Sequence, residues 1–353
     1  MIENKRIEYI DCMRGFTMIL VVACHVAAFC LGISDLTPSV HPILYEFRMP
    51  LFFFISGFVL YKEGVTWNWG YAASFLFKKK FPVQIITTLI FFLVYIKLFQ
   101  TTFLEGIYSD SKLGYWFTFI LFIYFCVYAL CRIIIHYTKC NDRIADIMIL
   151  AIGALFYLLF YVKSVCASLP IDHDVKNLLS LNHWGYYFFF TIGTLFKKHF
   201  ARIQTILDRK PLLLVCLILF FTLNLYYDEL TRTHINFLYA STALTGIVIV
   251  FSFFRTHQSV FNKETFVGRN LQFIGRRTLD VYLLHYLLLP VNLQSHFAFL
   301  SETPMPLIEF VITISISLIV VAGCLLISSI LRMSPILAYL LFGVRNKERK
   351  YST

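Results

Sequence analysis

Long apolar runs recur along the whole chain, and they constrain its fold more than any other feature. About 20 apolar residues in a helix span the hydrocarbon core of a bilayer, and a helix satisfies its own backbone hydrogen bonds, as lipid requires. The sequence therefore predicts an all-α polytopic membrane protein with about ten transmembrane helices. The predicted spans cover residues 14–33, 43–61, 81–101, 114–132, 144–163, 183–197, 211–227, 236–254, 278–294 and 305–332.

Composition agrees with a membrane bundle. Hydrophobic residues make up 59% of the 353 residues and charged residues only 14%, whereas about a quarter of the residues in a soluble domain are charged. We expect a single membrane domain over residues 1–353 that ends in a basic cytoplasmic tail at 333–353. The nine cysteines form no Cys-x-x-Cys pair, so neither a disulfide framework nor a metal site is expected.

The distribution of basic residues predicts the orientation. With the N-terminus in the cytoplasm, the inward segments hold 24 lysines and arginines and the outward loops hold four. This asymmetry follows the positive-inside rule and predicts that both termini are cytoplasmic. It also accounts for the net charge of +11 without a nucleic-acid partner.

The first apolar run carries ionisable residues, which are costly in lipid. Arg14 and His25 are eleven residues apart, so on a helix they share one stripe and lie about 16 Å apart along the axis. Asp11 lies one turn before Arg14, where opposite charges meet. In one interpretation Asp11 and Arg14 anchor the helix at the interface while His25 bridges two helices. In the other, the stripe lines a path from the cytoplasm to a buried imidazole that acts as general base or nucleophile.

A second arginine lies near the outer end of the second run. Arg48 is at a depth within about 5 Å of His25. It either stabilises an oxyanion or a substrate group in the site, or it pairs with Glu46 or Glu309.

The late apolar run and the outer loops hold further polar residues. Asp280 lies one turn from Arg276, which favours a structural ion pair. His285 is either part of the site or a hydrogen-bonded packing residue. His183 and its polar and aromatic neighbours either meet an acceptor sugar or anchor a helix at the interface.

Four stretches taken together resemble the membrane-bound acyltransferase family 3. "IDCMRGFTMILVVACH" is similar to its first-helix signature, in which an arginine, ten residues and a histidine follow an "IDxxRG" opening. "FRMPLFFFISGFVLYKE" resembles its second helix, and "GYWFTFILFIYF" a middle span that begins with Trp-Phe. "FIGRRTLDVYLLHYLLL" resembles its late "G-x-x-S/T-L-x-x-Y-L-x-H" span. The resemblance extends from about residue 7 to residue 330.

The resemblance implies an enzyme of the bacterial inner membrane that works on the cell envelope. Such enzymes take an acyl group, commonly acetyl, from cytoplasmic acyl-coenzyme A and place it on a glycan hydroxyl. Acyl-coenzyme A is then a co-substrate, and no bound cofactor is expected. By similarity, His25 is the catalytic base and Arg14 binds or orients the donor.

Other residues are candidates for binding the donor or the substrate. They are Asp11, Arg48, Lys78, Lys79, Lys80, Trp116, Tyr282 and His285. The three lysines depart from the family pattern, which often has Arg-x-x-Arg at the cytoplasmic start of the third helix. They either attract coenzyme A phosphates or serve as a plain positive-inside anchor.

Two other functions compete with acyl transfer. A transporter or flippase of a polysaccharide precursor, with no acyl-transfer chemistry, also uses intramembrane charges along a substrate path. A structural subunit among polysaccharide-assembly proteins is a third hypothesis. Consumption of acyl-coenzyme A by the purified protein separates the enzyme from both.

Overall fold

The computed structural model describes residues 7–33, 41–225, 236–297, 300 and 305–344. These residues form helices and no strand, which confirms the predicted all-α class. Within them, six helices are long and apolar enough to cross a membrane: Glu8–Cys30, Trp69–Phe99, Trp116–Thr138, Asp142–Phe160, Leu238–Thr256 and Pro306–Leu331. The count of ten stays a prediction, and the terminal segments predicted to be cytoplasmic, residues 1–6 and 345–353, lie outside the described residues.

Two of the predicted spans contain only short helices. Residues 183–197 fold as a 3₁₀ segment, η5 (Leu181–Tyr186), followed by α10 (Tyr187–Lys198). Residues 278–294 contain α16 (Thr278–Leu288), which ends because Leu289 is extended before Pro290. At 1.5 Å per residue, each helix is only about 16–18 Å long, so neither spans a hydrocarbon core of about 30 Å alone.

The chain divides into two compact units. Unit 1 comprises residues 1–55 and 201–329, and unit 2 comprises residues 56–200 and 330–353. The helices centred in unit 1 are α1 (Glu8–His25), η1 (Val26–Cys30), α11 (Phe200–Leu207), α12 (Lys210–Leu225), α14 (Asn236–Thr256), α15 (Phe266–Arg276), α16, η6 (Val291–Phe297) and α18 (Pro306–Leu331). Helix α2 (His41–Leu60) contributes to both units.

Unit 2 holds the remaining helices. They are α3 (Trp69–Ala73), η2 (Ser74–Lys80), η3 (Pro82–Ile86), α4 (Thr87–Phe99), α5 (Phe103–Tyr108), η4 (Lys112–Gly114), α6 (Trp116–Thr138), α7 (Asp142–Phe160), α8 (Lys163–Ser168), α9 (His173–Leu178), η5, α10 and α19 (Pro335–Phe342). Helix α19 lies in the predicted tail at 333–353, and its Phe342 ring packs 6.1 Å from that of Phe91.

Helix α1 is the centre of unit 1. Its residues Met13, Met18 and Val22 are fully buried. Aromatic rings from α14 cover one side, with Phe251 meeting Tyr9 at 6.0 Å in an edge-to-face contact. A membrane helix this deeply enclosed by protein has polar residues that face other helices rather than lipid.

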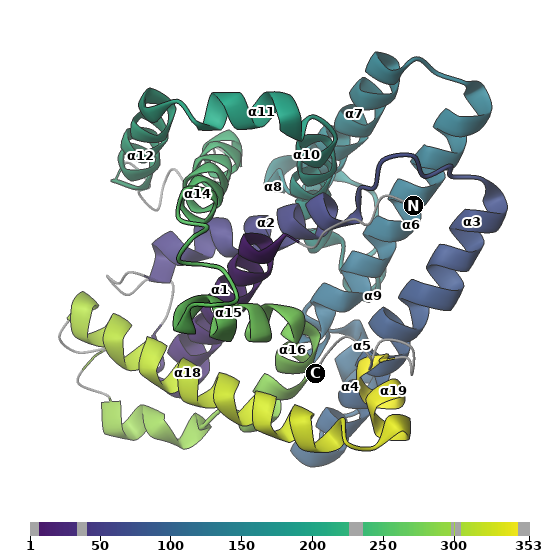
Figure 1. Cartoon of the computed structure of the whole chain (residues 1–353). Coiled ribbons are helices and arrows are strands. Elements are labelled where there is room, and N and C mark those ends of the chain that lie inside the picture. The colour runs from purple at the N-terminus through teal and green to yellow at the C-terminus, as the bar shows by residue number, and fades with distance from the viewer. Residues whose placement is uncertain (1–6, 34–40, 226–235, 298–299, 301–304, 345–353) are drawn as a thin grey trace. The chain divides into compact units, whose positions relative to one another are not determined.

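Two glycines let α1 and α15 touch along their backbones, and the two helices lie side by side in Figure 1. A Cβ atom at Gly15 would collide with the carbonyl oxygen of Leu271, and one at Gly275 with the carbonyl oxygen of Asp11. Small residues permit this close approach of membrane helices. The contact therefore fixes α15 against the start of α1.

Helix α10 is packed closely against other helices of unit 2, as α1 is in unit 1. A Cβ at Gly57 would collide with the backbone of Phe190, and one at Gly153 with the side chain of Thr191. The Phe190 ring also lies 5.7–6.1 Å from three rings on α6, those of Tyr124, Phe125 and Tyr128. Other helices of unit 2 therefore cover the buried face of this short helix.

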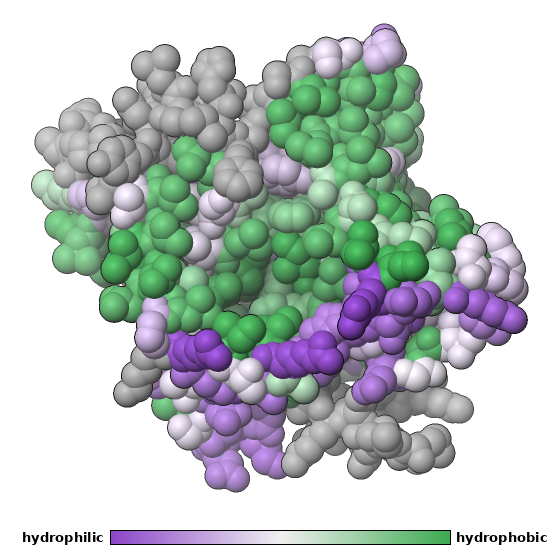
Figure 2. Space-filling view, turned by 90° about the horizontal axis from the view of Figure 1, so that it is seen from above, coloured by the Kyte–Doolittle hydropathy of each residue, from purple (hydrophilic) through white to green (hydrophobic). Residues whose placement is uncertain are grey.

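Large apolar side chains are exposed on many helices. Examples are Leu214 on α12 and Ile319 and Leu326 on α18, each 59–71% exposed. Figure 2 shows apolar side chains over much of the visible face, with polar ones gathered in a few places. Such a surface is unfavourable in water and suits a bilayer.

The close contact of α1 and α15 generates a stability prediction. Gly275→Ala inserts a methyl group against the Asp11 carbonyl, and we expect overpacking to cost about 1–3 kcal/mol. Gly323→Ala is the matched control, because its Cβ would meet only the Leu288 side chain at 3.6 Å. Size-exclusion chromatography of the solubilised full-length protein after heating to a series of temperatures measures the midpoint of thermal unfolding. We expect a lower midpoint for Gly275→Ala alone. Equal midpoints would contradict the contact.

Candidate active site

His25 is the last residue of α1, and the helix widens into the π-helical turn η1 immediately after it. Turns of this kind are rare and often occur at functional sites. The His25 side chain is partly buried beneath the Phe29 ring, which stacks on it at 5.9 Å. The backbone therefore changes geometry at the residue predicted to be the base.

Two residues of α16 complete a cluster of rings around His25. The ring centroids of His285 and Tyr286 lie 5.2 Å and 4.8 Å from that of His25, and 4.2 Å from each other. The Tyr286 hydroxyl lies 3.1 Å from Nε2 of His25 and 3.4 Å from its Nδ1. Unit 1 thus brings two imidazoles and a phenol into direct contact.

The hydrogen bonds of His285 define its tautomer. Its Nδ1 lies 2.7 Å from the carbonyl oxygen of Tyr282 and 3.1 Å from that of Val281. Because carbonyl oxygens only accept, the neutral ring carries its proton on Nδ1 and its lone pair on Nε2. His285 is fully buried, and its Nε2 has no hydrogen-bond partner among the described residues. This is the arrangement of an oriented base whose second nitrogen is held by a carbonyl group.

Helix α16 is anchored to α18 near its start. The Ser328 hydroxyl donates to the buried carboxylate of Asp280, and the Arg277 guanidinium donates to Ser329 at 2.6 Å. The Arg276 side chain, expected to pair with Asp280, donates to the Gln272 carbonyl at 3.2 Å. These contacts hold α16 in place one to two turns before His285.

Arg14 lies at the other end of the α1–α16 contact. Its guanidinium donates to Thr278 at 3.0 Å and lies 3.8 Å from the carboxylate of Asp11, as the spacing predicted. Arg14 therefore meets the first residue of α16, whereas His25 meets the last turn. Residue numbers increase in the same direction along both helices, so α1 and α16 run parallel, and the stripe from Arg14 to His25 faces α16.

Arg48 also belongs to unit 1. It is partly buried on α2, and its similarity in depth to His25 stays a prediction. Glu46 and Glu309, the alternative partners, are both buried. A partly buried guanidinium near the imidazole is suited to stabilising negative charge that develops on a reacting oxygen.

The predicted binding residue Tyr282 is buried on α16 in unit 1, with its ring 6.0 Å from that of His285, whereas the three lysines and Trp116 belong to unit 2. Lys78 and Lys79 are exposed, while the Lys80 ammonium lies 4.2 Å from the centre of the Phe125 ring. Trp116 begins α6 and stacks on His183 at 3.8 Å. For these residues a part in the His25 chemistry stays a prediction.

Tyr286 and Thr278 are the site residues that the sequence did not single out for a role. Thr278 belongs to the late motif and Tyr286 directly follows it, so position in the motif was the available signal. Within the described residues, no group of three or more histidine, cysteine, aspartate or glutamate side chains is arranged to hold a metal ion.

Comparison with known protein families identifies the family of this chain. The family model described as an acyltransferase domain matches residues 7–331, which is nearly the whole chain and includes both helices of the ring cluster. No curated protein and no solved structure matches the chain. The chain therefore belongs to acyltransferase family 3.

Proposed function

We propose that this acyltransferase moves an acyl group, acetyl in the simplest case, from cytoplasmic acyl-coenzyme A to a hydroxyl of a cell-envelope polysaccharide. Its proposed location is the bacterial inner membrane. The observation that carries the proposal is the cluster of His25, His285 and Tyr286, in which a buried imidazole lone pair lies beside a second imidazole. Acyl transfer to a hydroxyl requires such a base, because a neutral hydroxyl is a weak nucleophile.

The proposed reaction needs one proton to leave the acceptor and one to reach the leaving thiolate. His25 takes the proton of the acceptor hydroxyl as its oxygen attacks the thioester carbonyl carbon. The tetrahedral intermediate carries its negative charge on the former carbonyl oxygen, near the Arg48 guanidinium. When the carbon–sulfur bond breaks, the imidazolium returns the proton to the thiolate, which yields free coenzyme A and the acyl ester.

His285 and Tyr286 support His25 in this proposal. The Tyr286 hydroxyl orients the His25 ring. The Nε2 lone pair of His285 can accept a proton from the cluster, so that positive charge need not stay on one ring. In an apolar environment this sharing lowers the cost of forming an imidazolium.

Arg14 suits the binding of the charged part of the donor. It is separated from His25 by about 16 Å along α1, too far to act on the reacting carbonyl. Its side chain is 28% exposed and already fixed by Asp11 and Thr278. A guanidinium held in this way is a good partner for phosphate groups.

Substitution of either histidine should abolish most of the turnover. We expect His25→Ala and His285→Gln each to lower the rate of free coenzyme A release at least 10²-fold, the usual contribution of a positioned base. His257→Gln is the matched control, because His257 makes the same Nδ1 contact with the carbonyl four residues earlier, at 2.9 Å, on the exposed surface. A thiol assay on purified protein with acetyl-coenzyme A and surface polysaccharide measures the rates. Unchanged turnover in His25→Ala would refute the proposal, as would a transport activity without thiol release.

Tyr286→Phe tests the positioning role. It removes the hydroxyl that contacts His25 but keeps the ring, so the loss should be about tenfold or less, the value of one hydrogen bond. We expect kcat to fall while KM for the donor is unchanged. A fall as large as that of His25→Ala would show instead that the phenol itself transfers the proton.

Arg14→Gln tests donor binding. We expect KM for acetyl-coenzyme A to rise about 10–100-fold through loss of charge-assisted hydrogen bonds, with a smaller change in kcat. The exposed Arg269 on the same unit provides the control variant Arg269→Gln. An unchanged KM with a large fall in kcat would place Arg14 in the chemical step.

A further inference from the structure

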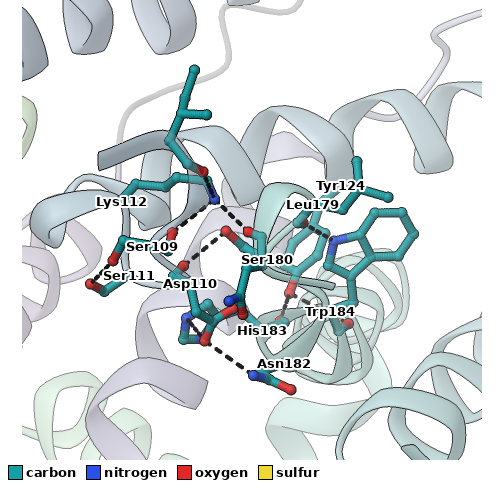
Figure 3. A network of polar contacts seen from close by, with 12 residues as sticks. Ser109, Asp110, Ser111, Lys112, Tyr124, Leu179, Ser180, Asn182, His183 and Trp184 are labelled. Atoms are coloured by element: carbon teal, nitrogen blue, oxygen red, sulfur yellow. Dashed lines mark hydrogen bonds and ion pairs between the residues drawn. The ribbon is translucent and has the colours of Figure 1, made fainter. Parts of the chain in front are cut away.

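A second polar cluster lies in unit 2, at the predicted outward ends of the spans 114–132 and 183–197 and in the loops next to them (Figure 3). Asp110 follows α5, and Asn182 and His183 belong to η5. The Asp110 carboxylate accepts from the Asn182 amide at 3.2 Å and lies 3.4 Å from Nε2 of His183. The mechanism proposed for unit 1 uses none of these residues.

An aromatic stack adjoins the carboxylate. The rings of His183 and Trp116 lie 3.8 Å apart at an angle of 15°, and the Tyr186 ring is nearly parallel to both at 6.2–6.4 Å. The side chain of His183 is 19% exposed, so the stack and the surrounding protein enclose most of its ring.

The backbone that carries this cluster is held rigidly. The Lys112 ammonium donates to the carbonyl oxygens of Ile107, Ser109 and Asn177 at 2.7, 2.9 and 2.5 Å, which uses all three of its protons. The Ser180 hydroxyl donates to the Asp110 carbonyl at 2.9 Å. These bonds join the two loops, as Figure 3 shows.

Strain is concentrated in the same two loops. Lys112, Leu113 and Ser180 have φ of 48–53°, a conformation that costs a non-glycine residue of order 1 kcal/mol or more. Such strain persists where the surrounding structure enforces it, commonly at binding sites. The loops are therefore built to hold Asp110 and His183 in one arrangement.

The chemistry of the cluster selects a class of ligand. Aromatic faces pack against the C–H faces of sugar rings, while carboxylate and amide groups bind hydroxyls. The Asp110 Oδ1 is buried and has no donor among the described residues, while Oδ2 accepts from the exposed Asn182 side chain. The Asp110 carboxylate repels anionic ligands. The Lys112 ammonium already donates to three carbonyl groups, so it is not available to attract them, and the cluster therefore favours an uncharged ligand.

We propose that Asp110, Trp116, Asn182 and His183 form a subsite for one uncharged saccharide ring of the acceptor glycan. The proposal rests on the proposed function, because it gives the acceptor a binding place. The Asp110 side chain is 30% exposed and that of His183 19%, while Asn182 is exposed. The partly exposed Asp110 carboxylate and the exposed Asn182 side chain are therefore the polar groups that a glycan meets at the surface.

The test measures sugar binding without turnover. Full-length protein in lipid nanodiscs is mixed with methyl glycosides of glucose, galactose, N-acetylglucosamine and rhamnose, and saturation-transfer NMR gives the affinities. We expect at least one glycoside to bind the wild type, and Asp110→Ala and Trp116→Leu to weaken its binding at least tenfold. Asn182→Ala, a change at an exposed side chain, should weaken it at least threefold and decides the matter if either of the other variants misfolds.

Two controls separate this proposal from that of unit 1. Asp174→Ala should bind as the wild type does, because the neighbouring His173–Asp174 pair is 84% and 76% exposed. His25→Ala should also bind normally, although it fails in turnover. Failure of every glycoside to bind, unchanged binding in Asp110→Ala and Trp116→Leu, or binding of glycerophosphoglycerol in place of glycosides would overturn the subsite. If the wild type bound a glycoside but did not turn over acetyl-coenzyme A, only the proposed function would be overturned.

Discussion

The parallel contact of α1 and α16 is the interaction on which the candidate active site depends. Polar groups in an apolar interior must find partners, because each unsatisfied one costs several kcal/mol in lipid. Arg14 donates a hydrogen bond to Thr278 at one end of the contact, and His25 lies within hydrogen-bond distance of the Tyr286 hydroxyl at the other. A shift of one residue along either helix moves a side chain by about 1.5 Å and 100°, which breaks both contacts together. The register of the two helices is therefore fixed by the same residues to which the proposed function assigns the chemistry.

The glycine contact between α1 and α15 explains how this register arises. Helix α15 ends at Arg276 and α16 begins at Thr278, so a single residue joins them. Because Gly275 touches the backbone of α1 at Asp11, the first turn of α16 must begin beside Arg14. Backbone contact through small residues thus sets the position of the contact between Arg14 and Thr278. The direction of α16 then determines which of its residues reach His25.

Periodicity and charge predicted the parts of this arrangement that depend on one helix. The stripe from Arg14 to His25 follows from helical geometry, and the Asp11–Arg14 pair from its spacing. Helix length was harder to predict, since hydropathy does not distinguish residues buried by protein from residues that face lipid; α10 and α16 are apolar and yet too short to cross alone. Tyr286 carried no signal of its own, because it is one of 21 tyrosines in an aromatic-rich chain. Contacts between distant segments, such as that of His25 with Tyr286, are not encoded in any single window.

The spacing of charge along α1 suits a reaction inside a membrane. A charged nucleotide is expensive to move into an apolar region, whereas an uncharged thioester is not. Arg14 is partly exposed at one end of the α1–α16 contact, while the imidazoles lie about 16 Å further along the helix. In the proposed function, the phosphates of acyl-coenzyme A therefore stay at the arginine while only the thioester end reaches the histidines. Proton transfer between two neutral rings and a hydroxyl leaves little net charge to solvate there. The same separation keeps the Arg14 guanidinium from stabilising the oxyanion, a task that the proposed function assigns to Arg48.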